Sequence, residues 1–567
     1  MIPIRAGFIV AATSLLATSG WSPPPTTSPM LTAMSFELNR EMRGFASQPT
    51  PPYFISYEIA EANTATIRGS FGAIDENIRE RHRSLIVDLR VGTPKLDNTH
   101  GARSGFFGVA ALMGLGGFTA VPLDDDTAAV RAVLWSQTDQ RFKTAVQTLS
   151  SAHTNAALTV QAEDTSADFS PEPQAQDVQP VAPLTIDTAL WASKIRLYTA
   201  PFARVKDIYS GEAVLNATVE TRWYVNSEGT RIQTSQPYYR LLISAFSKAD
   251  DGMELPKYQS WMALTPQDLP NDSTVHAAVA QMIADLHALR VAPVAEPFTG
   301  PAVLSGRASA VFFHEVFGHR VEGHRQKRED EGQTFKKSVN QSVLPAGFSV
   351  YSDPTLSREG QTDLAGYYRY DDEGVLARKV TVVDDGVLRN FLMSRSPIEG
   401  FPSSNGHGRG QIGMPPVARQ SNLIITAAHP KTHAELKQML IDEIKRQQKP
   451  FGLLFDDIEG GFTITERGVP NAFDVLPIMV YRVYPDGREE LVRGVDFVGT
   501  PLTVFSQILA ADDQVAVFNG MCGAESGWVP VSAVSPGILL KQIEVQKKTK
   551  DNGRPPILPA PDSGASR

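Results

Sequence analysis

The chain has 567 residues, of which 42% are hydrophobic and 20% charged, and its formal net charge is −9 at pH 7. This length allows about two to four domains with substantial cores, and the negative balance argues against binding of nucleic acid through a general basic surface. The chain contains one cysteine, Cys522, which excludes an intramolecular disulfide framework.

Residues 1–19 have the pattern of a secretory signal peptide. Arg5 precedes an apolar run from Ala6 to Ala17, and Ala17-Thr18-Ser19 offers small residues for cleavage. The run is too short to span a bilayer as a mature helix, so we expect no stable membrane span. We expect an exported protein, periplasmic or extracytoplasmic. The alternative is a cytoplasmic chain whose N-terminal segment is buried or disordered.

Residues 30–160 are predicted to form an N-terminal α/β domain. Apolar periodicity favours helices at Met30–Arg43 and Asp124–Ser151, and alternation favours a strand at Ser84–Val91. The glycine-studded segment Phe106–Phe118 is predicted to be a tight loop or bent helix. A nucleotide-binding loop is disfavoured there, because no strand–GxGxxG–helix context or phosphate-binding lysine accompanies the glycines.

Residues 161–185, rich in Pro, Asp and Gln, are predicted to be an exposed linker or insertion. Residues 186–295 then form a predicted middle domain. It contains an antiparallel meander between Val214 and Met262, with turns at glycine-containing segments. A helix follows at Ser273–Leu289, with Ser273 as its N-cap.

Residues 296–546 are predicted to form a β-rich C-terminal domain, and residues 547–567 a disordered tail. Thr432 and Glu435 have the spacing of a capping box for a helix that runs to about Arg446. The predicted fold class is α+β: an N-terminal mixed α/β region with an antiparallel meander, then a β-rich domain that bears the candidate metal-binding helix. Hairpins are expected at Asp384-Asp385-Gly386 and Pro485-Asp486-Gly487.

The segment His314-Glu315-Val316-Phe317-Gly318-His319 contains the groups of a hydrolytic metal site. Neutral imidazoles bind Zn²⁺, and a glutamate can take a proton from water that the metal activates. Histidines four apart, as in H-E-x-x-H, lie roughly 40° apart around a helix, whereas histidines five apart lie roughly 140° apart. For both to face one metal, the helix must widen, as at a π-bulge, or break near Gly318. The alternative is a polar helix whose histidines hydrogen-bond locally.

Cys522 lies far downstream, between Gly520 and Gly523. A thiolate there could complete a three-ligand zinc set with an open fourth position for water, as catalytic sites require. Coordination would also protect a lone thiol in an oxidising compartment. The alternative is a small buried apolar residue, which free cysteines often are.

The segment His314–Gly323 (H-E-V-F-G-H-R-V-E-G) closely resembles the signature of the TldD/PmbA family of metallopeptidases. Further motifs in the same order extend the resemblance from residue 296 to residue 545. They are Asp371–Gly374, Lys379–Leu388, Ser404–Arg409 followed by Pro415, Arg419 and Asn422, and Asn519–Gly523 followed by Val529–Val531.

The resemblance implies that His314, His319 and Cys522 bind one Zn²⁺ per chain and that Glu315 is the general base. It also implies a peptidase that cuts unfolded peptides or small flexible proteins within a sheltered chamber of a dimer. The dimer partner would be a second copy or a related subunit. Because the catalytic half is β-rich, an extended peptide could add to an exposed sheet edge.

Four further residues are candidates for supporting roles. His407 and Arg409 could bind the oxyanion or a substrate carboxylate; alternatively, they form a loop whose arginine pairs with a surface carboxylate. Glu322 is a candidate to orient His319. His324 stands where the family usually has an acidic residue, and it could be a partner of a ligand, a competing ligand or a surface histidine.

Two other functions remain open. The chain could be a non-catalytic partner subunit of a TldD/PmbA-type heterodimer, since the family contains members without the metal motif. It could also be an exported structural or binding protein, which the signal peptide and the meander would suit.

Overall fold

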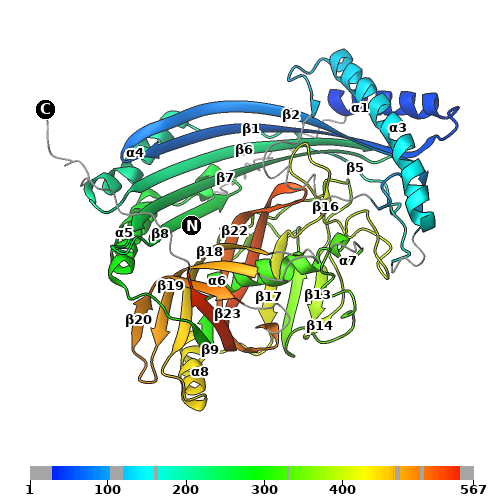
Figure 1. Cartoon of the computed structure of the whole chain (residues 1–567). Helices are drawn as coiled ribbons and strands as arrows, with labels where there is room; N and C mark the ends of the chain where they lie inside the picture. The colour runs from blue at the N-terminus through cyan, green and yellow to red at the C-terminus, as the bar shows by residue number, and fades with distance from the viewer. Residues whose placement is uncertain are drawn as a thin grey trace, which may run out of the picture.

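The computed structural model describes residues 28–101, 119–158, 164–327, 331–463, 465, 473–498 and 504–548 (Figure 1). The predicted signal peptide, the Phe106–Phe118 loop and nearly all of the predicted tail lie outside these residues. Within them, no helix is both long and apolar enough to cross a membrane.

A large, mostly antiparallel sheet dominates the first half and arches over the rest of the molecule (Figure 1). Among the described residues, eight strands form it in the order β3-β2-β1-β6-β7-β5, with β4 on β2 and β8 on β7. Its consecutive strands β6, β7 and β8 confirm the predicted meander. The strands are β1 (Pro52–Ser70), β2 (Ala73–Thr93), β3 (Leu96–Asp97), β4 (Thr119–Ala120), β5 (Gln176–Val178), β6 (Ser210–Asn226), β7 (Arg231–Lys248) and β8 (Glu254–Ala263).

This sheet joins the two N-terminal regions that the sequence analysis placed in separate domains. Strand β1 pairs with β6 from Ser56↔Asn226 to Ser70↔Glu212. Strand β5, in the predicted linker at 161–185, pairs with β7. The regions 30–160 and 186–295 therefore contribute to one sheet, and the segment between them supplies an edge strand instead of separating two folds.

Helices cover the two ends of the sheet. Helices α1 (Pro29–Phe45) and α3 (Thr127–Leu158) include most of the two helices predicted in the first region. Helix α5 (Asp272–Val291) confirms the third, but the prediction that Ser273 caps it is wrong. Asn271 has the extended backbone of a cap, and its side chain accepts a hydrogen bond from the Thr274 amide at 2.9 Å. The remaining elements here are α4 (Thr188–Thr199), η1 (Ala200–Arg204) and η2 (Pro266–Asp268).

The second half forms a β-rich domain, which confirms the predicted α+β fold class. Among the described residues its main sheet has eleven strands in the order β14-β13-β10-β17-β23-β21-β19-β18-β9, with β20 on β19 and β22 on β23. The strands are β9 (Phe298–Leu304), β10 (Phe348–Ser352), β13 (Val380–Asp384), β14 (Val387–Leu388), β17 (Asn422–Ala427), β18 (Gly452–Thr463), β19 (Phe473–Val483), β20 (Glu489–Val492), β21 (Val495–Val498), β22 (Ile508–Ala524) and β23 (Gly527–Lys547).

Local predictions for this domain hold. Helix α8 (His433–Arg446) begins with the predicted capping box of Thr432 and Glu435. The two predicted hairpins connect β13 to β14 and β19 to β20. The other elements are α6 (Gly306–Phe312), η3 (Phe313–Phe317), η4 (Gly318–Val321), α7 (His324–Lys327), and the strand pairs β11 (Arg358–Glu359) with β12 (Thr362–Asp363) and β15 (Gly408–Arg409) with β16 (Val417–Ala418).

Two elements of this domain position the candidate site. Helix α6 and its continuation cross the main sheet beside the long β22–β23 hairpin, which reaches up beneath the arched N-terminal sheet (Figure 1). The first element carries His314 and His319, and the hairpin carries Cys522.

Candidate metal centre

The helix that carries the two histidines changes its pitch between them, which is one of the two ways in which both could face one metal. Helix α6 starts at its cap Ser305, continues as the π-helical turn η3 and then tightens into the 3₁₀ turn η4. The predicted widening is therefore confirmed. The rings of His314 and His319 lie on one side of it, with centroids 5.1 Å apart.

Side chains from outside the turn satisfy the backbone that the wide turn leaves free. The Arg320 guanidinium donates to the carbonyls of Glu315 at 3.1 Å and Val316 at 2.9 Å. The Gln420 amide donates to the carbonyl of His314 at 3.3 Å. A Cβ at Gly318 would lie 1.8 Å from the Gln420 amide oxygen, so a larger residue would displace this amide from the turn. These side-chain hydrogen bonds therefore stabilise the irregular turn.

The structure brings together the three predicted ligands, whose donor atoms all lie within 4.8 Å of one another. The Cys522 sulfur is 3.3 Å from Nε2 of His319, and all three side chains are buried. Ligands of one tetrahedral zinc lie about 3.5 Å apart, so this pair is already at ligand spacing. Nδ1 of His314 is buried with no hydrogen-bond partner in the described part of the chain. A two-nitrogen, one-sulfur donor set fits a borderline-soft metal such as Zn²⁺.

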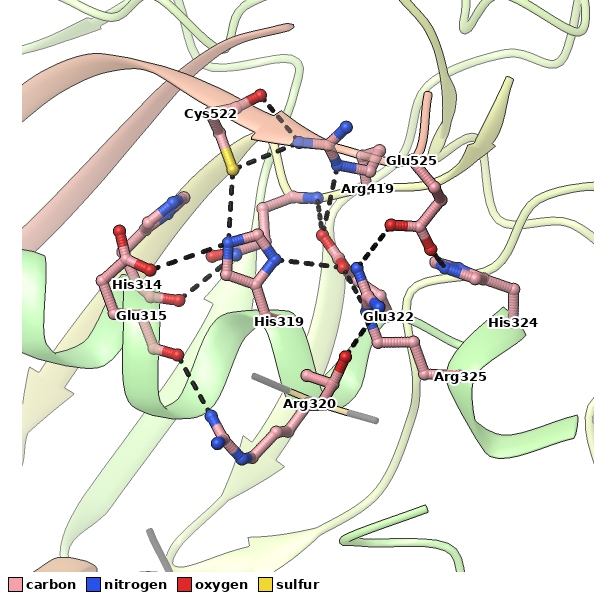
Figure 2. Close-up of polar contacts among 12 residues, drawn as sticks. His314, Glu315, His319, Arg320, Glu322, His324, Arg325, Arg419, Cys522 and Glu525 are labelled. Atoms are coloured by element: carbon pink, nitrogen blue, oxygen red, sulfur yellow. Dashed lines mark hydrogen bonds and ion pairs between the residues drawn. The ribbon is translucent and has the colours of Figure 1, made fainter. Parts of the chain in front are cut away.

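Glu315 lies beside this cluster. Its carboxylate is 3.9 Å from Nε2 of His319, and only 9% of the residue is exposed (Figure 2). Burial raises the pKa of Glu315 above its usual value, although the neighbouring His314 and His319 oppose the shift. A carboxylate with a raised pKa is a better proton acceptor near neutral pH.

Arg419 holds the cysteine from the opposite side. Its guanidinium donates to the Cys522 sulfur at 3.2 Å and to the Cys522 carbonyl at 2.8 Å. Burial alone would raise the pKa of Cys522, but the charges of His319 and Arg419 outweigh it and hold that pKa well below its usual value. The thiolate, which is the form that binds metal, is therefore favoured. In the sequence, Arg419 stands out only as part of a motif, and no pattern there predicts this contact.

Glu322 contacts the other side of His319. Its carboxylate lies 3.2 Å from Nδ1 of His319, and it also pairs with Arg325 at 2.9 Å and Arg419 at 3.5 Å (Figure 2). Burial would raise the pKa of Glu322, but His319 and Arg325 keep it far below its usual value. A carboxylate on Nδ1 leaves Nε2 facing Cys522, which is the arrangement that metal-binding histidines commonly need.

His324 lies outside the ligand cluster and is not on the surface. It is 8% exposed, and its Nε2 pairs with the carboxylate of Glu525. Glu525 also accepts a hydrogen bond from Arg325 at 2.8 Å. Of the alternatives that the sequence left open, the structure favours a supporting contact near the ligands.

His407 does not have the surroundings of a substrate-binding residue. It is fully buried, with Nε2 3.0 Å from the Ser352 hydroxyl and Nδ1 3.1 Å from the Asn405 side chain. Burial lowers the pKa of His407 to about 3, so the ring is neutral and serves the packing of its loop. The prediction that His407 contacts substrate is not supported, because both ring nitrogens are engaged within the protein.

Arg409 differs from its neighbour because it faces a cavity. The cavity, of about 340 Å³, lies between the arched sheet and the β22–β23 hairpin. The guanidinium stacks over Tyr368 at 4.8 Å and donates to the Gln420 carbonyl at 2.7 Å. Among the described residues it forms no ion pair, which excludes the predicted alternative of a surface arginine–carboxylate pair there. Aromatic side chains make up much of the lining: Tyr238, Tyr367, Tyr368, Tyr370 and Trp528.

The chain is similar to known metalloproteases over part of its length. Residues 298–547 match the PmbA/TldA metallopeptidase C-terminal domain. A metalloprotease of Archaeoglobus fulgidus is 29% identical over 240 residues, which are 42% of this chain and 51% of the relative. A zinc metalloprotease TldD homolog of Saccharolobus solfataricus is 22% identical over 250 residues, 43% of this chain and 51% of the relative. The chain thus spans about half the length of these curated relatives.

The fold also matches solved structures over almost the whole chain. TldE from Thermococcus kodakarensis superposes with a TM-score of 0.60 at 13% identity, covering 91% of this chain and 100% of TldE. At this identity the likeness concerns the fold alone. The arched sheet and the β-rich domain therefore occur together in a related architecture.

Proposed function

We propose that this chain is a zinc-dependent peptidase of the TldD/PmbA family, because residues 298–547 match the PmbA/TldA metallopeptidase C-terminal domain. The observation that carries the proposal is the convergence of His314, His319 and Cys522, from segments some two hundred positions apart, to within 4.8 Å. The zinc metalloprotease name of the Saccharolobus solfataricus relative supports zinc as the metal.

The mechanism assigns one task to each group around the centre. Zn²⁺, when bound, makes water acidic enough to attack near neutral pH and polarises the substrate carbonyl. Glu315 accepts the proton of the attacking water and delivers it to the leaving amine. Glu322 holds the ring of His319, and Arg419 holds the thiolate of Cys522, so that the donors stay in place without substrate.

The proposed substrates are unfolded peptides or small flexible proteins. Strand β22, which ends beside Cys522, pairs only with β23 among the described strands, apart from a single bridge between Asp512 and Lys431. An extended peptide that pairs with this free edge would lie next to the metal centre and bind through its backbone. Replacing single peptide amides by N-methyl amides should weaken binding, whereas a strict requirement for one side chain would contradict strand addition.

Arg409 is the proposed contact for a substrate carboxylate. A buried guanidinium without a carboxylate partner is costly, and an anionic ligand would offset that cost. The carboxylates of the same cavity are already engaged: Asp372, for example, pairs with Arg222 at 3.1 Å. The ligand could be the C-terminus of a peptide or an acidic side chain.

We propose two further properties of the whole protein. It forms a dimer with a second copy or a related subunit, as the family resemblance implies; light scattering of the purified chain, alone and with candidate subunits, tests this. It is exported, as Arg5 and the run Ala6–Ala17 suggest, and N-terminal sequencing of the secreted or periplasmic protein should start after Ser19.

The alternatives to a peptidase make different predictions. A non-catalytic partner subunit would have no need for Glu315 beside three converging ligands, and an exported binding protein would hydrolyse no peptide. Unfolded peptide incubated with wild type and with Glu315→Gln decides between them. We expect hydrolysis by the wild type and its loss in the variant with zinc retained; no hydrolysis by zinc-loaded wild type would contradict the proposal.

A further inference from the structure

The metal centre is assembled from two segments that must be held together. His314 and His319 lie on the helix, whereas Cys522 lies near the tip of the β22–β23 hairpin. Glu525 follows Cys522 by three residues at this tip, and Figure 2 shows its carboxylate facing His324 and Arg325.

Glu525 makes two polar contacts with α7, the short helix that follows the turns bearing His314 and His319. One carboxylate oxygen pairs with Nε2 of His324, and the other accepts from Nη2 of Arg325 at 2.8 Å. Only 14% of the Glu525 side chain and 9% of the Arg325 side chain are exposed. Because both side chains are largely buried from solvent, dissolved salt weakens these contacts much less than it weakens surface ion pairs.

Arg325 continues the connection to a ligand. Its Nε donates to Glu322 at 2.9 Å, and Glu322 lies 3.2 Å from Nδ1 of His319. An unbroken series of contacts therefore runs from the hairpin tip through Glu525, Arg325 and Glu322 to the imidazole opposite Cys522.

We propose that Glu525 is a positioning residue that clasps the cysteine hairpin to the histidine helix, so that the thiolate and the imidazoles are at ligand spacing before zinc binds. The proposal rests on the zinc centre proposed above. A ligand set that is fixed in advance loses less conformational freedom on binding, and partners of this kind usually change metal affinity strongly.

The experiment compares Glu525→Gln with Glu331→Gln as a matched control. Glu331 also pairs with Arg325, at 3.3 Å, but it lies outside the hairpin. Both variants remove one carboxylate from the same guanidinium, and only the first removes a contact between the hairpin tip and α7.

Two readouts follow the clasp independently of activity. The zinc dissociation constant, from competition with a chromogenic chelator, should rise about ten- to a hundredfold in Glu525→Gln. The alkylation rate of zinc-free protein reports access to Cys522, the chain's one thiol, which is 5% exposed. We expect it to rise about tenfold or more in Glu525→Gln, because breaking a buried pair favours local opening. Glu331→Gln should stay near wild type in both.

Equal zinc affinity and equal alkylation in Glu525→Gln and wild type would overturn the proposal, as would equal effects of the two variants. If Glu525→Gln does not fold, His324→Gln removes one arm of the clasp and should shift both readouts in the same direction by less; no shift would again overturn it. Failure of wild type to bind zinc would contradict the proposed function instead, while the alkylation comparison would still report on the clasp.

Discussion

The metal centre and the Arg409 cavity both contain buried arginines, but their charges are matched differently. At the metal centre, Arg325 contacts the carboxylates of Glu322, Glu331 and Glu525, and Arg419 contacts Glu322 and the Cys522 sulfur. In the cavity, Arg409 has a tyrosine ring and one carbonyl as partners and forms no ion pair with the described carboxylates.

The difference indicates two kinds of site. Around the three candidate ligands, the protein supplies its own counter-charges, so these donor atoms are held in place without a substrate. The cavity leaves a cation for a ligand to neutralise. If the proposed roles hold, substitutions near the three candidate ligands and in the Arg409 cavity should affect zinc binding and substrate binding separately.

Glu315→Gln should give the largest effect. Glutamine keeps the shape of the side chain but cannot accept a proton, so kcat/KM for an unfolded peptide should fall about a hundred- to ten-thousandfold. Zinc content should match wild type because Glu315 is not a ligand. A variant that keeps more than a tenth of the activity would show that another group is the base.

Glu322→Gln should give the second-largest effect. It tests whether residues around the candidate ligands affect zinc affinity. The amide still fits beside Nδ1 of His319 but loses the charge that His319, Arg325 and Arg419 face. Zinc affinity, measured with a competing chelator, should fall about ten- to a hundredfold. Unchanged affinity would mean that Glu322 only neutralises the arginines.

Arg409→Gln tests the other side of the comparison. For a peptide with a free C-terminus we expect about a tenfold rise in KM, the scale of a lost charge-assisted hydrogen bond, with kcat and zinc content near wild type. The matched control is Arg378→Gln, an exposed arginine of the same domain.

Two peptide series identify the carboxylate that Arg409 binds. If it is the chain end, amidating the C-terminus should raise the wild-type KM and abolish the difference between wild type and Arg409→Gln. If it is an acidic side chain, replacing internal Glu by Gln in the peptide should raise the wild-type KM and abolish that difference. A uniform loss across all peptides, amidated and neutral ones included, would contradict a carboxylate subsite.

Substitution of His407 should give the smallest effect, and it tests whether this residue lies outside the substrate site. Burial lowers the pKa of His407 to about 3 from an ordinary value of 6.5, so the unfolded chain binds the extra proton first as pH falls. The contribution of the neutral ring to the free energy of unfolding is therefore fully present above pH 6.5. It decreases as the pH falls from 6.5 to 3. Between pH 6.5 and 5.5 this group should remove about 1 kcal/mol from the free energy of unfolding.

Urea unfolding of wild type and His407→Gln at the two pH values measures this contribution. The variant should lose stability overall but depend less steeply on pH. An identical pH dependence in both proteins would show that the ring is already accessible to protons in the folded state.

Local sequence patterns predicted the elements that carry the chemistry. The five-residue spacing of His314 and His319 required a wide turn, and the structure has one; the capping box of α8 and two hairpin turns also followed from short-range patterns. Strand β1 was missed because its burial extends over both faces. Glu58 and Glu61 are buried in it and look exposed in the sequence, since their partners Arg222, Arg81 and Arg83 lie elsewhere in the chain.

The partners of the metal ligands could not be predicted in the same way. Arg419, Gln420 and Glu525 reach the centre across about a hundred or two hundred positions, and no periodicity marks them. His407 and Arg409 lie two residues apart in one glycine-rich segment, yet one is enclosed and the other faces a cavity. Only the three-dimensional packing distinguishes them.

Zinc stoichiometry of purified wild type, Cys522→Ala and His324→Ala tests the central claim most directly. We expect about one zinc per chain in wild type and in His324→Ala, and loss of zinc in Cys522→Ala, because only Cys522 of these two lies with the imidazoles at ligand spacing. Full zinc content in Cys522→Ala would contradict the ligand set on which the mechanism depends.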